Sequence, residues 1–95
     1  MSMAQVKSIY FRRASVEALN EIASPESVPI LVQRLDDPDL LVQFETIKAL
    51  SAITGDTDRS HAPFFPEFEQ ASAKYIAFWK DWWTSVGSTI YAPPK

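Results

Sequence analysis

An all-α fold of four helices, arranged as antiparallel hairpins in a short stack, is predicted for this chain of 95 residues. Apolar residues recur at helical spacing in four segments, and prolines, aspartates or a glycine separate these segments. Only two glycines occur, which favours helices over a β-barrel or a sandwich. The length and the apolar fraction of 46% fit one folded domain over residues 1–95.

The composition narrows the classes of function. A net charge of -3 gives no overall attraction to nucleic-acid phosphates or to anionic membranes. No apolar run is long enough to span a membrane, so we expect no membrane partner. Cysteine is absent, which excludes disulfides and thiolate metal sites and fits a reducing compartment. We therefore expect a cytoplasmic protein.

The first two predicted helices are separated by a proline boundary. The first helix spans about residues 8–23, and the second spans about residues 26–35. Ser24 precedes Pro25, and a residue before proline avoids the α conformation, so the first helix ends there. The predicted apolar face of the first helix consists of Phe11, Ala14, Ala18, Leu19 and Ile22. That of the second consists of Val28, Leu31, Val32 and Leu35.

The third predicted helix, about residues 38–54, is the centre of the fold because it is apolar on two sides. Asp37 is the predicted N-cap, with Pro38 at the first helical position, and Gly55 closes the helix. One side carries Val42, Thr46, Ala49, Leu50 and Ile53. The other side carries Leu40, Phe44 and Ile47. Neighbours are therefore expected on both sides.

The fourth predicted helix spans about residues 67–86 and follows a loop over residues 56–66. Gly87 is predicted to end it, and the tail, residues 88–95, is predicted to be extended. The apolar arc of this helix is rich in aromatic residues and contains Tyr75, Ile76, Phe78, Trp79, Trp82, Trp83 and Val86. Packing in the core is the favoured interpretation of these tryptophans over an open stacking platform.

A shift of 31 residues aligns the chain with itself. Ala18, Leu19 and Ile22 then fall on Ala49, Leu50 and Ile53. Such a period is typical of stacked helical hairpins. The segment SPESVPILVQRLDDPDLLVQFETIKALSAITG resembles one full HEAT repeat, and Phe11 to Ile22 resembles the inner helix of a preceding, truncated repeat. The resemblance implies a minimal HEAT-like α-α superhelical stack whose inner helices line a concave, partner-binding surface.

Within that resemblance, six residues of the two inner helices are the candidate protein-binding site. They are Ile9, Arg13, Val16, Leu40, Phe44 and Ile47. Two interpretations remain open for this band. Either it is exposed on the concave face, or the loop and the fourth helix fold over it. An exposed band favours pairing of two copies, so we predict a homodimer with Phe44 near its interface.

No arrangement of residues that carries chemistry is found in the sequence. Asp36, Asp37 and Asp39 lack the glycine and glutamate that a calcium loop needs at its sixth and twelfth positions, and helix capping explains them. His61 is the only histidine, and no nucleophile and orienting carboxylate frame it. We therefore predict no catalytic residue, no metal site, no cofactor and no enzyme activity.

The predicted function is a non-enzymatic protein-interaction module or small scaffold. It would use the concave face or an open end of the stack, because a repeat stack leaves each terminal unit with an uncovered face. The sequence does not name the protein partner. One alternative is a small-molecule or nucleic-acid binder that uses the tryptophan-rich helix and the basic pair Arg12-Arg13, although nucleic acid is not expected from the charge. Another is an auxiliary subunit of an enzyme.

Overall fold

The computed structural model describes residues 9–91, which form helices joined by turns, with no strand in that part of the chain. Four of the α-helices have seven or more residues, as the all-α prediction expects. In chain order the elements are α1 (Ile9–Ile22), the 3-10 turn η1 (Pro25–Ser27), α2 (Val28–Arg34), α3 (Leu40–Thr54), α4 (Phe65–Gln70), α5 (Ser72–Trp82), the π-helical turn η2 (Trp83–Gly87) and α6 (Ser88–Tyr91).

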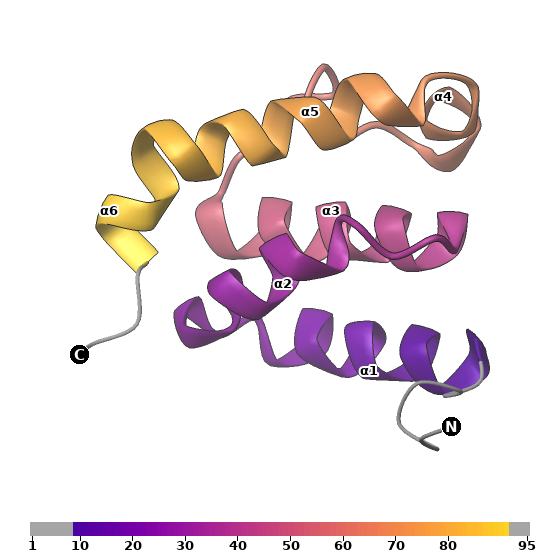
Figure 1. Cartoon of the computed structure of the whole chain (residues 1–95), viewed down its shortest axis with the longest axis horizontal. Helices are drawn as coiled ribbons and strands as arrows, with labels where there is room; N and C mark the ends of the chain where they lie inside the picture. The colour runs from indigo at the N-terminus through magenta and orange to yellow at the C-terminus, as the bar shows by residue number, and fades with distance from the viewer. Residues whose placement is uncertain (1–8, 92–95) are drawn as a thin grey trace.

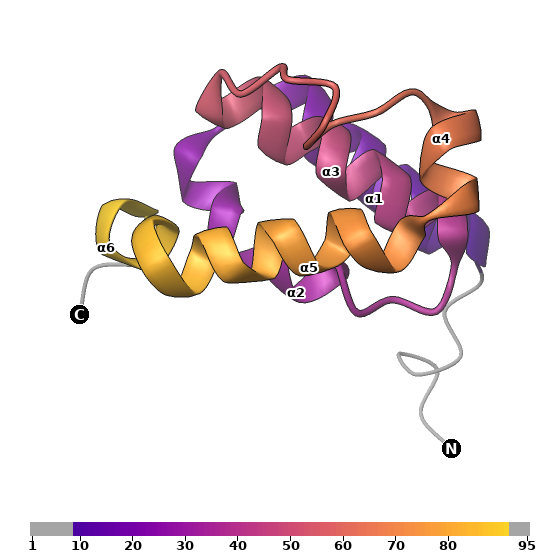
Figure 2. The same cartoon turned by 90° about the horizontal axis from the view of Figure 1, so that it is seen from above.

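The central helix α3 lies between α1 on one side and α5 on the other (Figure 1). α2 packs against α3 on the side of α1, and α4 packs against α3 on the side of α5. Seen from above, α5 runs at an angle to the α1–α3 pair (Figure 2). Val42, Thr46 and Leu50 are fully buried from one side of α3, and Ile47 is fully buried from the other. The two-sided apolar pattern thus gives α3 neighbours on both sides.

The N-cap of α3 is Asp39 and not the predicted Asp37. Asp39 has an extended backbone, and its side chain accepts a hydrogen bond from the Val42 N–H at 3.0 Å. Asp37 accepts instead from the Asp39 N–H at 2.8 Å, so it supports the cap from outside the helix. The helix consequently begins at Leu40, two residues later than predicted, whereas its predicted end at Gly55 is confirmed by a left-handed φ of 81°.

The prediction of one fourth helix over residues 67–86 is wrong, because the structure divides this region into α4, α5 and η2. α4 begins earlier, with Pro66 in its first turn, and the chain leaves the helical conformation at Ala71. Phe68 of α4 and Trp79 of α5 are fully buried on the two sides of this break.

The predicted end at Gly87 is also wrong, since the chain continues into α6. A Cβ at Gly87 would lie 2.7 Å from ring carbons of Trp82, so this glycine makes room for an indole instead of ending a helix. Residues 88–91, predicted to be extended, are helical. Residues 92–95 of the predicted tail, and Ser8 of the first predicted helix, lie outside the described residues. None of the helices within residues 9–91 has the length and apolarity needed to cross a membrane.

Candidate functional site

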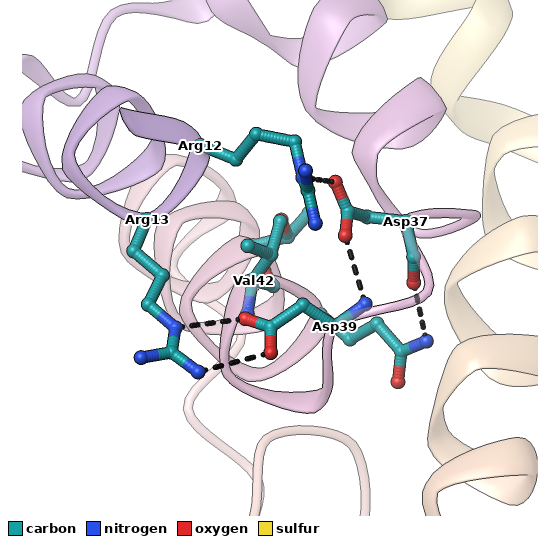
Figure 3. Close-up of polar contacts among 7 residues, drawn as sticks. Arg12, Arg13, Asp37, Asp39 and Val42 are labelled. Carbon is teal, nitrogen blue, oxygen red and sulfur yellow. Dashed lines mark hydrogen bonds and ion pairs between the residues drawn. The ribbon is translucent and has the colours of Figure 1, made fainter. Parts of the chain in front are cut away.

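A ladder of ion pairs joins α1 to the turn before α3 (Figure 3). The Arg12 Nε donates to the Asp37 Oδ2 at 2.8 Å. Arg13 makes two bonds to Asp39, from Nε at 2.9 Å and from Nη2 at 3.0 Å. Gln43 completes the ladder, since its Nε2 donates to the backbone oxygen of Asp37 at 2.6 Å. The ladder fixes the start of α3 against α1.

The charges of this ladder balance locally. The guanidinium of Arg13, together with the Val42 N–H, holds the pKa of Asp39 below its usual range although partial burial opposes this shift. The hydrogen bond to Asp39 raises the pKa of Arg13 in return. The basic pair Arg12-Arg13 is therefore engaged with Asp37 and Asp39, and its charge is not free to meet a phosphate.

The six candidate protein-binding residues lie on α1 and on α3, two helices that pack against each other. Val16 and Ile47 are fully buried. Phe44 packs edge-on against Phe65, with ring centroids 5.1 Å apart. It also packs at a tilt against Phe68, with centroids 5.6 Å apart. Ile9 and Leu40 are partly buried, and Arg13 is held by Asp39. α4 thus covers Phe44, whereas Ile9, Arg13 and Leu40 keep part of their surface exposed.

An exposed apolar strip lies instead on the outward side of α1. Ile22 is 66% exposed and Phe11 is 53% exposed, and Ala14 and Ala18 between them are exposed as well. The sequence pattern predicts these four residues on the core face of this helix. That prediction is wrong, because all four are exposed. Leu19, the fifth member of that predicted face, packs against the core. We call Phe11, Ala14, Ala18 and Ile22 the outer strip.

The internal repeat explains why the pattern of the outer strip looks like a core pattern. A shift of 31 residues places Phe11 on Val42 and Ala18 on Ala49, and both of these α3 residues are fully buried. The main neighbours of α3 are α1 and α2, which precede it in the stack. Among the described residues no element packs on the equivalent face of α1, and its outer strip is exposed.

Comparison with known families decides the assignment of the repeat. A family model described as HEAT repeats matches residues 2–64, well over half of the chain. The chain belongs to the HEAT-repeat family. Searches of curated proteins and of solved structures found no match.

The HEAT match ends at residue 64, and α4 begins at the next residue, Phe65. The aromatic helices α4 and α5 thus lie outside the matched repeats and cover the far side of α3. Trp79 is fully buried there, and its Nε1 donates to the His61 backbone oxygen at 2.8 Å. Trp82 and Trp83 are partly buried and contact each other. This HEAT stack is therefore closed at its C-terminal side by its own aromatic residues.

His61, the only histidine, links the loop before α4 to α5. Its ring stacks on Phe78 with centroids 3.8 Å apart, and its Nδ1 lies 2.8 Å from the Asp56 Oδ2. No sequence signal indicates this contact, because it joins a loop to a helix that follows much later. Within residues 9–91, no group of three or more side chains is arranged to hold a metal ion.

Proposed function

We propose that this HEAT-repeat protein is a non-enzymatic interaction module whose protein partner binds the outer strip of α1. HEAT repeats commonly mediate protein–protein interaction, which supports the class of function. The observation that carries the proposal is the exposure of Ile22 and Ala18 at positions whose α3 equivalents form packed repeat contacts. An exposed apolar helix face supports an interaction surface at this position.

The other end of the stack offers less to a partner. Phe44 and Ile47, which the concave-face hypothesis requires, are packed beneath α4 or fully buried. A partner at that side would have to displace Phe65 and Phe68 first. The same packing removes the reason for a homodimer across Phe44. Of the two surfaces in the hypothesis, the open end of the stack is the one that the exposures support.

A nucleic-acid or small-molecule ligand is supported less well. Arg12 and Arg13 already neutralise Asp37 and Asp39, and the tryptophan with the deepest position, Trp79, has no exposed ring face to stack on a base. An enzyme subunit as the partner would make this chain an auxiliary subunit. The proposal includes this alternative, because an enzyme subunit would also be a protein partner.

The test compares two alanine-to-glutamate variants at exposed mid-helix positions. Ala18→Glu places a charge in the outer strip, whereas Ala77→Glu places one on the exposed side of α5. Proteins captured from cell extract are identified by mass spectrometry, and one is then purified for calorimetry. We expect wild type and Ala77→Glu to bind it equally and Ala18→Glu to bind at least roughly tenfold more weakly. Equal binding by all three would contradict the proposal.

A further inference from the structure

We infer that the element docking on the outer strip is a cationic amphipathic α-helix of a different protein; this inference rests on the proposed function. The outer strip is long and narrow. Phe11 and Ile22 are eleven residues apart, or roughly 16 Å along the helix axis, which matches about three turns of a partner helix. Ala14 and Ala18 lie between them, and small side chains let another helix approach closely.

Charge next to the outer strip selects the partner. Glu17 and Glu21 are both exposed, and as residues four apart they lie on one side of α1, beside the two alanines. No ion pair within the described residues contains either of them. The nearest cations in sequence, Arg12 and Arg13, point to Asp37 and Asp39 across the junction with α3 (Figure 3). The rim of the strip is therefore anionic, which calls for lysine or arginine beside the apolar stripe of the partner.

The same rim argues against a second copy of this chain. Two outer strips meeting across a two-fold axis would bring Glu17 and Glu21 of both copies to one interface. Like charges brought together in this way oppose association, and the outer strip itself supplies no cation to neutralise them. A heterologous helix with basic residues on its flank meets both the apolar strip and the carboxylates.

The probes are two fluorescein-labelled helical peptides of about 16 residues, long enough to match the strip. Both carry leucine and alanine at i, i+3, i+4 and i+7 spacing; one has lysine on both flanks and the other has glutamate. Fluorescence anisotropy measures binding to wild type, Ala18→Glu, Ala77→Glu and the double variant Glu17→Lys with Glu21→Lys. Circular dichroism checks that each variant is folded.

We expect wild type and Ala77→Glu to prefer the lysine peptide by at least roughly tenfold. The double variant should reverse this preference, and Ala18→Glu should weaken binding of both peptides. Equal binding of the two peptides to wild type, or no binding of the lysine peptide at about 100 μM, would overturn the inference. So would self-association in sedimentation that Ala18→Glu abolishes, because the occupant would then be a second copy. If the captured partner still depends on Ala18 while the peptides fail, the proposed function stands and only the inference of a cationic helix falls.

Discussion

Asp39 connects two elements through one side chain. Its carboxylate caps α3 through the Val42 N–H and also receives the guanidinium of Arg13 from α1. Because the folded state favours the ionised form, the pKa of Asp39 is lower there than in the unfolded chain. The stabilisation from ionised Asp39 is thus fully present above the unfolded pKa of about 4 and is lost as the pH falls through the lower, folded pKa.

Asp39→Asn should separate the cap from the charge. Asparagine caps a helix about as well as aspartate, so the variant loses mainly the ion pair, at a cost of about 1 kcal/mol at pH 7. The difference in unfolding free energy between wild type and Asp39→Asn should stay constant from pH 7 to about 5 and shrink below about 4. Urea denaturation at several pH values measures it. A difference that is unchanged at about pH 3 would show that the charge of Asp39 does not stabilise the fold.

At the scale of elements, α4 decides what α3 can offer. The edge-on contact of Phe44 with Phe65 places an aromatic cluster where a concave binding band was predicted. The family pattern in the sequence does not describe this cover, since the HEAT match ends before α4. α4 therefore turns a surface of the stack into part of its core.

Phe44→Glu should destabilise the monomer by about 2–4 kcal/mol, because a carboxylate would replace a ring packed on Phe65 and Phe68. Phe64→Glu is the matched control, since that ring is 61% exposed and the Arg59 guanidinium lies over its face. Thermal unfolding followed by circular dichroism should show a large loss for the first variant and a small one for the second. Equal, small losses would mean that α4 does not cover α3.

The first three helices could be predicted from the sequence because their signals are local. Proline boundaries and a closing glycine at Gly55 mark the helix ends, and the period of 31 residues relates one repeat to the next. The break at Ala71 has no such signal, because no proline or glycine lies between Phe68 and Trp79. The exposure of the outer strip could not be predicted either, because it depends on which elements pack against α1. Periodicity identifies Ala18 and Ile22 as apolar, but it does not say whether any neighbour covers them.

The described part of the molecule, residues 9–91, is a short HEAT stack with two unlike sides. α4 and α5 pack on one side of α3, α1 lies on the other (Figure 1), and the outer strip of α1 is exposed. We therefore propose that a partner adds to the stack at α1 and leaves the aromatic side unchanged. The central claim is therefore that the outer strip is exposed in the free protein and becomes covered by its partner.

Solvent accessibility of isoleucine methyl groups, measured by NMR with a soluble paramagnetic agent, tests this claim most directly. In the free protein we expect the Ile22 methyl groups to be strongly broadened and those of the fully buried Ile47 to be protected. Addition of the captured partner should protect Ile22 and leave Ile30, which is 46% exposed on α2, as accessible as before. An Ile22 that is already protected in the free protein, or that stays accessible in the complex, would contradict the account.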